Sequence, residues 1–135
     1  MYTLSLVFNK NKDKVLMCDH KKLDALNYIG GKTLDNEDLM VASYRELKEE
    51  TGIDVKDVDL QFLRYEAVTI NNGHGADVWE MYITCGVLNR DLELKPEAND
   101  LLWVDIDDYE LLLTAYGDGN CLTFLVQAMR LLNIH

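Results

Sequence analysis

The stretch GKTLDNEDLMVASYRELKEETGI, residues 31 to 53, contains the features that decide the fold of this chain. Its segment from Asp38 to Thr51 has no glycine or proline, which favours one uninterrupted helix. The apolar residues that share one face of this helix are Met40, Tyr44 and Leu47. Gly52 follows directly, and glycine readily adopts the left-handed conformation that ends many helices. We therefore expect the helix to end at Gly52.

The face of this helix beside the apolar one is acidic. At about 100° per residue, Glu46, Glu49 and Glu50 fall within an arc roughly 100° wide. Glu46 repels each of the other two by roughly a few tenths of a kcal/mol, and Arg45 can neutralise only part of this charge. Carboxylates are ligands that Mg²⁺ accepts, and Mg²⁺ in proteins often also binds substrate phosphates. The cluster indicates either a metal site for phosphate chemistry or a solvated acidic face.

The size and composition of the chain indicate one globular domain. The chain has 135 residues and is 48% hydrophobic, enough to bury a core. We expect residues 1–135 to form a single domain. The N-terminal residues do not resemble a signal peptide, and no apolar run reaches the roughly 20 residues that span a bilayer. A soluble, cytoplasmic protein is expected, with reduced and mostly buried thiols at Cys18, Cys85 and Cys121.

The charge balance restricts the partners of the chain. The 24 acidic and 13 basic residues give a formal net charge of -11. This charge repels nucleic-acid polymers and anionic membranes, so neither is an expected partner. A small anionic substrate meets the same repulsion, and divalent cations would screen it. The sequence does not determine the oligomeric state.

Around the central helix, the chain alternates between strand-like and helix-like segments. We expect strands at Tyr2–Asn9, Lys14–Cys18, Leu60–Ile70, Val78–Val87 and Leu101–Ile106, and helices at Asp107–Leu113 and Asn120–Leu132. Residues 71–75 are expected to form a hairpin loop. The residues predicted to pack from the last helix are Leu122, Leu125, Val126, Met129 and Leu132. The fold class predicted is α/β, a sandwich with a mixed sheet between helices.

The spacing of the residues in the opening stretch resembles a known family. The fixed positions are Gly31, Glu37, Arg45, Glu46, Glu49, Glu50 and Gly52, with the apolar residues Leu47 and Ile53. This pattern is similar to the Nudix box of the Nudix hydrolases, Gly-x5-Glu-x7-Arg-Glu-U-x-Glu-Glu-x-Gly-U, where U is apolar. The resemblance implies the family's α/β/α fold and hydrolysis of a nucleotide-like diphosphate or triphosphate.

The resemblance also implies a metal site. Glu46 and Glu50 would be ligands of Mg²⁺, with Mn²⁺ as an alternative ion, and Glu49 would assist them or orient the metal-bound water. A backbone carbonyl near Gly30 would complete the inner shell. Arg45, together with Glu37, would hold the glutamates in place.

The general base remains open, because family members take it either from the box or from a later loop. The later candidate is Glu97, in the segment before the strand that contains Trp103, where it could also contact the metal. Asp100 is its rival. For both residues, a solvated loop acid is the alternative interpretation.

The rest of the chain resembles the MutT-type hydrolases of oxidised purine nucleoside triphosphates. Asn27 falls where those enzymes place an asparagine that reads the base, and its amide both donates and accepts. Tyr116 and Asp118 resemble their aromatic-x-Asp segment, in which the ring stacks on the base. Thr3 and Lys32 complete the implied substrate-binding set.

Two departures from that branch leave base selectivity open. Gly119 stands where a second acid is expected, and Leu26 precedes Asn27 in place of an aromatic residue. The favoured function is hydrolysis of a nucleoside triphosphate, such as 8-oxo-dGTP, to the monophosphate and pyrophosphate. The alternatives are a pyrophosphatase for ADP-ribose, nucleotide sugars or dinucleoside polyphosphates, and a non-catalytic nucleotide sensor. The intact box and the absence of a second domain argue against the sensor.

Overall fold

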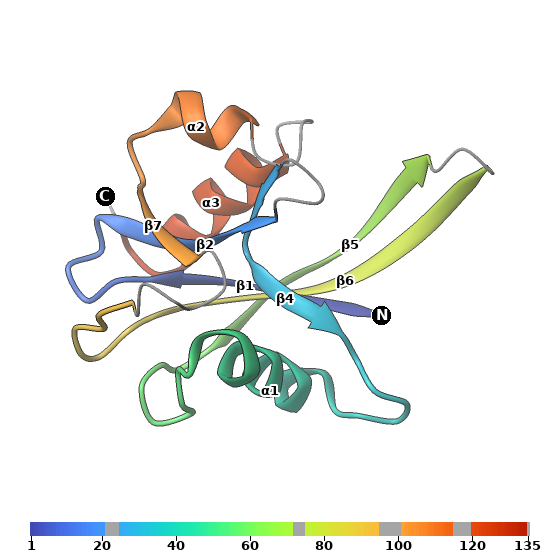
Figure 1. Ribbon diagram of the computed structural model, residues 1–135, viewed down its shortest axis with the longest axis horizontal. Coiled ribbons are helices and arrows are strands. Elements are labelled where there is room, and N and C mark those ends of the chain that lie inside the picture. The colour runs from blue at the N-terminus through green and yellow to red at the C-terminus, as the bar shows by residue number, and fades with distance from the viewer. Residues whose placement is uncertain (21–24, 72–74, 95–100, 115–119, 135) are drawn as a thin grey trace.

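The computed structural model describes residues 1–20, 25–71, 75–94, 101–114 and 120–134, which fold into three layers (Figure 1). The strands are β1 (Tyr2–Phe8), β2 (Lys14–His20), β3 (Ala25–Asn27), β4 (Ile29–Lys32), β5 (Gln61–Asn71), β6 (Ala76–Val87) and β7 (Leu101–Asp105). The helices are α1 (Leu39–Thr51), α2 (Tyr109–Thr114) and α3 (Asn120–Leu131). The predicted α/β sandwich is confirmed.

The strands form one mixed sheet with β1 near its centre. The strand order is β3-β2-β1-β6-β5, while β4 also pairs with β1 and β7 with β2. β1 and β6 run parallel, with Tyr2 opposite Met81 and Phe8 opposite Val87. The other named strand pairs are antiparallel. This arrangement places β1 between two segments that are far apart in the sequence.

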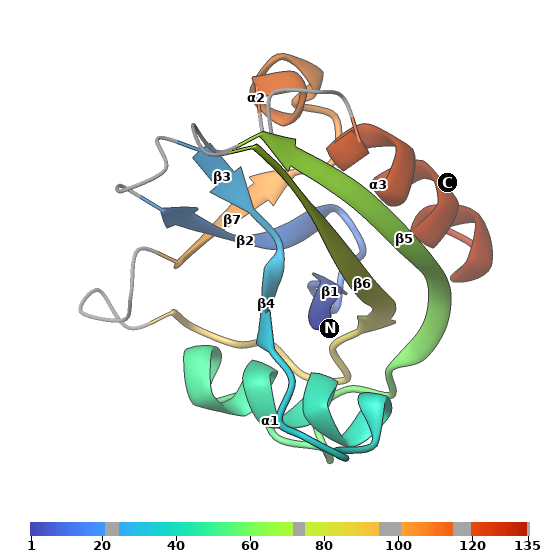
Figure 2. The same cartoon turned by 90° about the vertical axis from the view of Figure 1, so that its right-hand side faces the viewer.

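The helices cover opposite faces of the sheet, with α1 on one side and α2 and α3 on the other (Figures 1 and 2). Each face has its own hydrophobic core, because side chains of a strand alternate between faces. Leu4, Leu6 and Phe8 of β1 belong to the core on the α2–α3 side, whereas Val7 packs with Leu47 on the α1 side. β1 therefore alternates between two buried faces rather than between core and solvent.

Both ends of α1 are capped; the cap at Gly52 is the predicted one, whereas Asp38 lies before the helix as its N-cap rather than inside it. The Asp38 carboxylate accepts hydrogen bonds from the backbone N–H groups of Met40 and Val41 at 3.0 and 3.1 Å. Gly52 has a φ of 79°, and its N–H donates to the Lys48 carbonyl at 2.9 Å. A residue with a side chain is strained at such a φ, which explains glycine here. The two caps set the length of the helix that carries the acidic face.

The structure corrects one predicted helix face and contains two short strands that were not predicted. Val126 of α3 is 43% exposed, so its predicted place in the packed face is wrong, and Phe124 is buried there instead at 3% exposure. The strands β3 and β4, only three and four residues long, were not predicted. The helix α2 begins at Tyr109 rather than Asp107, because residues 105–108 first form a turn.

The expected burial of the thiols holds where the structure describes them. Cys18 and Cys85 are buried, and burial raises the pKa of the Cys85 thiol to about 11. The side chain of Cys121 lies outside the described residues. In the described part of the chain, none of the helices is both long and apolar enough to cross a membrane.

Candidate active site

The site begins at the glycine pair of β4, which lies between β1 and the acidic helix. In the antiparallel pairing of β1 with β4, Leu4 is opposite Gly30 and Thr3 is opposite Gly31. A Cβ atom at Gly30 would overlap the backbone carbonyl of Thr3. Only glycine permits this close approach of the two backbones. Gly30 therefore lets β4 lie tightly against β1.

Gly31 serves a different neighbour, the carboxylate of Glu46. A Cβ atom at Gly31 would lie 2.5 Å from the Glu46 carboxyl carbon and 2.8 Å from its Oε1. Ordinary van der Waals contact begins at about 3.4 Å, so no larger residue fits without moving the carboxylate. Because Gly31 has no side chain, the Glu46 carboxylate can occupy the space beside it. The Glu46 side chain retains 13% of its exposure there.

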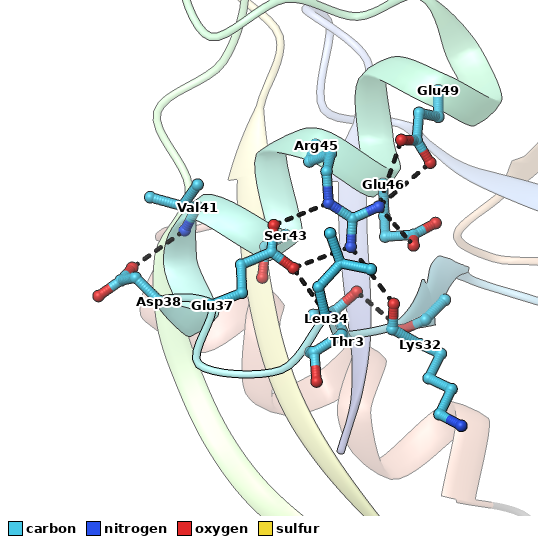
Figure 3. Close-up of polar contacts among 12 residues, drawn as sticks. Thr3, Lys32, Leu34, Glu37, Asp38, Val41, Ser43, Arg45, Glu46 and Glu49 are labelled. Carbon is cyan, nitrogen blue, oxygen red and sulfur yellow. Dashed lines mark hydrogen bonds and ion pairs between the residues drawn. The ribbon is translucent and has the colours of Figure 1, made fainter.

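Arg45 connects the loop before α1 to the acidic face (Figure 3). Its Nε and Nη2 donate to the two carboxylate oxygens of Glu37 at 2.7 and 2.9 Å. Its Nη1 donates to Glu46 at 3.0 Å and to Glu49 at 3.2 Å, and Nη2 reaches the Lys32 carbonyl at 3.3 Å. A planar guanidinium with five donors suits such a network, whereas a lysine could not make all these bonds.

Glu37 is the fixed end of this network. Its side chain is 11% exposed, and the N–H of Leu34 donates to it at 3.0 Å. The hydrogen bonds from Arg45 and from the Leu34 backbone lower the pKa of Glu37 to about 2. Glu37 is therefore a carboxylate at neutral pH, and it orients Arg45 toward Glu46.

Glu50 is in a different electrostatic position from its neighbours. Burial, the charge of Glu46 and the charge of Glu49 raise the pKa of Glu50 to about 7, against a hydrogen bond from the Gly30 backbone. Among the described residues, no lysine, arginine or histidine forms an ion pair with it. A half-buried carboxylate beside two other carboxylates carries unbalanced negative charge. Such a group favours a cation close to it.

The carboxylate and carbonyl oxygens of this site suit a hard divalent cation, although the side chains do not converge on one point. Within the described ranges, no three acidic, histidine or cysteine side chains converge closely enough to hold a metal. Glu49 is 57% exposed and turns toward Arg45 (Figure 3). Glu46 and Glu50 both lie beside the glycine pair, where carboxylate and carbonyl oxygens are available. These are the ligand types that Mg²⁺ prefers.

A model of the NUDIX domain matches residues 2–123 of the chain. The chain belongs to the Nudix family. The Uncharacterized Nudix hydrolase YvcI of Bacillus subtilis (strain 168) is 27% identical over 123 residues, which are 90% of this chain and 77% of that protein. The protein is therefore a Nudix hydrolase, an enzyme that acts on phosphoric anhydride bonds.

Solved structures of the family share the fold at low sequence identity. The E. coli dihydroneopterin triphosphate pyrophosphohydrolase has a TM-score of 0.74 and 18% identity, covering 94% of this chain and 95% of that one. The MutT protein of Bacillus halodurans has 0.73 and 22%, covering 93% and 80%. The C. elegans Ap4A hydrolase has 0.71 and 14%, covering 97% and 96%. Because two of these proteins are named for different substrates, Ap4A and dihydroneopterin triphosphate, the shared fold does not specify one.

Three residues predicted to contact the substrate of this Nudix hydrolase lie in described segments. Thr3 is 2% exposed, and its hydroxyl donates to the Gly31 carbonyl at 3.4 Å, so it supports the glycine pair. The Lys32 side chain is exposed, and its ammonium points away from Arg45 (Figure 3). Asn27 ends β3, and its Oδ1 is buried without a hydrogen-bond donor among the described residues.

The other predicted site residues lie outside the described part of the chain. They are Glu97, Tyr116 and Asp118. The role of Glu97 as general base or metal contact and the roles of Tyr116 and Asp118 at the nucleobase remain predictions. The metal and catalytic roles of Gly30, Glu46, Glu49 and Glu50 likewise remain predictions, with the geometry above as their support.

The contact between Gly31 and Glu46 was not predicted from the sequence. The pair of adjacent glycines before the helix was its only signal. A glycine pair in a short apolar segment indicates a close backbone approach, but the group that approaches it lies fifteen positions later. The supporting role of Thr3 also depends on the pairing of β1 with β4, which the sequence did not indicate.

Proposed function

We propose that this Nudix hydrolase is a Mg²⁺-dependent pyrophosphohydrolase that cleaves a nucleoside triphosphate to the monophosphate and pyrophosphate. The observation that carries the proposal is the half-buried carboxylate of Glu50, which lies beside Glu46 and Gly30 without a cationic partner among the described residues. A divalent cation would balance this charge, and the phosphate chain of a substrate would share its coordination.

Glu46, Glu50 and the Gly30 carbonyl are the proposed ligands, with Glu49 and Glu97 as further candidates and Mn²⁺ as an alternative ion. When bound, the metal polarises the phosphoryl oxygens and lowers the pKa of a bound water. The general base is one of the carboxylates of the box or the later loop. The chain thus supplies ligands from one helix and one adjacent strand.

Arg45 and Glu37 are proposed as positioning residues. The Glu37 carboxylate holds two donors of Arg45, which leaves Nη1 to bind Glu46 and Glu49. A ligand whose rotamer is fixed in this way loses little conformational freedom when the metal binds. Arg45 therefore aligns the acidic face before the substrate arrives.

The nucleobase is proposed to bind at Asn27. Its buried Oδ1 lacks a donor among the described residues, and an unpaired buried carbonyl oxygen costs about 1–3 kcal/mol. The N–H groups of a purine edge would satisfy it, which supports a purine triphosphate and includes 8-oxo-dGTP as a candidate. Tyr116 and Asp118 would supply stacking and a second edge contact, while Thr3 and Lys32 would line the approach to the phosphates.

Other substrates of the class compete with this proposal. ADP-ribose, nucleotide sugars and dinucleoside polyphosphates contain the same phosphoric anhydride bond, and one structural neighbour is named an Ap4A hydrolase. A non-catalytic nucleotide sensor is the alternative of another class. The unpaired Glu50 favours the enzyme, because a sensor has no need of an uncompensated carboxylate. The charge of -11 argues against binding to anionic membranes or nucleic-acid polymers.

The test is phosphate release from a panel of substrates with and without Mg²⁺, coupled to a pyrophosphatase for the triphosphates and to an alkaline phosphatase for the substrates whose products are phosphomonoesters or nucleotides. The panel contains normal and oxidised purine dNTPs, ADP-ribose, nucleotide sugars and dinucleoside polyphosphates. We expect Mg²⁺-dependent turnover that favours a purine triphosphate. Preference for another member would retain the hydrolase but reject the base site at Asn27. No turnover on any member would favour the sensor.

A pair of matched variants tests the metal assignment. Glu50→Gln removes the unpaired charge and should abolish Mg²⁺-dependent turnover without unfolding the chain. Glu110→Gln makes the same chemical change on the exposed first turn of α2, in the opposite layer, and should retain turnover. Full activity of Glu50→Gln would refute the assignment of this residue as a ligand.

A further inference from the structure

The outermost strand of the sheet, β5, presents a long edge that is not paired. The strand spans 11 residues and lies at the end of the strand order, with β6 as its neighbour. In the described ranges, no further strand pairs with its other side. Figure 1 shows β5 and β6 extending together beyond the other strands. Proteins usually protect such an edge, because its free N–H and C=O groups can pair with another chain.

The common protective devices are scarce along β5. The strand has no proline and no lysine, and its register irregularity lies between Phe62 and Arg64. From Arg64 to Asn71 its pairing with β6 is uninterrupted. Two aromatic side chains of the strand are also largely exposed, Phe62 at 42% and Tyr65 at 58%, and their rings pack together at 5.0 Å. The edge therefore presents both unpaired backbone and apolar surface.

The charged residues of this edge can pair with those of a second, antiparallel copy of the same edge. Arg64 and Glu66 lie on either side of Tyr65, and their side chains form an ion pair of 2.6 Å between Nη2 and Oε2. If a second β5 pairs antiparallel about a two-fold axis at Tyr65, Arg64 lies opposite Glu66 of the second copy. The symmetry creates two such pairs at once. Opposite charges facing each other across strands stabilise the pairing.

A hollow beside the first half of β5 provides room for this contact. It has a volume of about 500 Å³ and lies between Phe62–Arg64 and the residues Gln127, Arg130 and Leu131 of α3. Arg130 has no ion-pair partner among the described residues, so it adds a second positive charge there. In the symmetric arrangement, this hollow faces the half of the second β5 that carries Glu66.

We propose that two copies of this chain pair through their β5 edges in an antiparallel, two-fold symmetric dimer centred on Tyr65. The two sheets then form one continuous sheet, with Tyr65 beside its symmetry mate and Arg64 opposite Glu66. A second copy fits better than an unrelated partner, because the two halves of the edge complement each other. Because a net charge of -11 makes two copies of the chain repel each other, such a dimer depends on pairs of opposite charge at the interface.

The test is sedimentation equilibrium of the full chain at increasing concentration. We expect wild type to reach a mass near twice the 15.5 kDa of one chain. Arg64→Glu and Glu66→Arg each place like charges opposite each other, and each should raise the dimer dissociation constant at least about tenfold. The double variant Arg64→Glu/Glu66→Arg should restore dimerisation, since it only exchanges the positions of the two charges.

Further variants separate loss of pairing from loss of folding. Arg64 also donates to Gln127 at 3.1 Å and packs over the Phe124 ring, so Arg64→Glu could unfold the chain. Tyr65→Lys alters an exposed residue at the axis and should also give monomers, with thermal unfolding as the check of folding. Lys10→Glu, at the exposed β1–β2 turn, makes the same charge change as Arg64→Glu but away from β5, and should leave the dimer intact.

Three results would overturn the proposal. Wild type that remains monomeric throughout the concentration series would exclude the dimer. Folded single variants that dimerise like wild type would exclude the β5 edge as the interface. A folded double variant that stays monomeric would exclude the pairing of Arg64 with Glu66. None of these measurements depends on catalysis, so they are independent of the proposed enzymatic function.

Discussion

Replacing Gly31 with alanine tests whether the position of Glu46 controls catalysis. The new Cβ would lie 2.5 Å from the Glu46 carboxyl carbon, whereas ordinary contact begins at 3.4 Å. The Glu46 Oε2 lies closer still, so the carboxylate must move by about 1 Å. Displacement of a catalytic group by about 1 Å can lower the rate on the order of 100-fold. We expect Mg²⁺-dependent kcat to fall by that order of magnitude in Gly31→Ala.

The stability of Gly31→Ala should change little, because the displaced group is the end of a flexible side chain. We expect the free energy of unfolding to fall by less than about 1 kcal/mol. Gly52→Ala is the matched control. Its Cβ meets nothing within 4 Å, but its φ of 79° strains any side chain, so it should lose about 1 kcal/mol of stability.

The two glycine variants are thus expected to behave in opposite ways. Substrate turnover at saturating Mg²⁺ gives kcat, and urea unfolding gives the stability of the same preparations. Gly52→Ala should retain near-normal kcat below its unfolding temperature. If Gly31→Ala retained full activity, the reasoning that Glu46 acts from the space beside Gly31 would be refuted.

Three further changes probe the network and the fold. Arg45→Lys should lower kcat about 10- to 100-fold in steady-state assays while Glu37 stays ionised, because lysine cannot bind all the oxygens that Arg45 reaches; unchanged kcat would contradict a positioning role. Asp38→Ala removes the N-cap of α1 and should cost about 1 kcal/mol in urea unfolding, an effect that would be absent if water replaced the cap equally well. Arg90 lowers the pKa of Asp57 to about 2. The contribution of this ion pair to stability is therefore present above the ordinary Asp pKa of 3.8 and is lost as the pH falls toward 2. The stability difference between wild type and Arg90→Gln, measured by urea unfolding, should therefore be constant near neutral pH and shrink over that acidic range; a difference independent of pH would refute the linkage.

The sequence predicted those elements whose signals are local. The end of α1 was predicted from Gly52, because a cap acts on the backbone beside it. The strand β3 was missed because three residues are too few to show an alternating pattern. Val126 was assigned to the packed face because apolar character was treated as burial, whereas isolated apolar residues are common on surfaces.

In the candidate site, too, the features with a local signal were predicted and the tertiary contacts were not. The spacing of the glutamates on α1 indicated an acidic face and its family, since three- and four-residue spacings bring side chains together on any helix. The opposition of Gly31 and Glu46 and the buried Oδ1 of Asn27 arise only when β4 and β3 pair with their neighbours. Tertiary contacts of this kind have no signature in residue spacing.

The parallel pairing of β1 with β6 has a consequence for how the protein is made. Ser5 and Thr84 share a buried hydrogen bond of 2.9 Å across 79 positions of sequence. Contacts this distant in sequence form slowly, because a long loop must close first. A nascent chain synthesised as far as Gly52 contains the glycine pair and the whole acidic helix, yet β1 still lacks its parallel neighbour. The segment proposed to bind the metal is therefore synthesised well before the sheet that holds it in place can assemble.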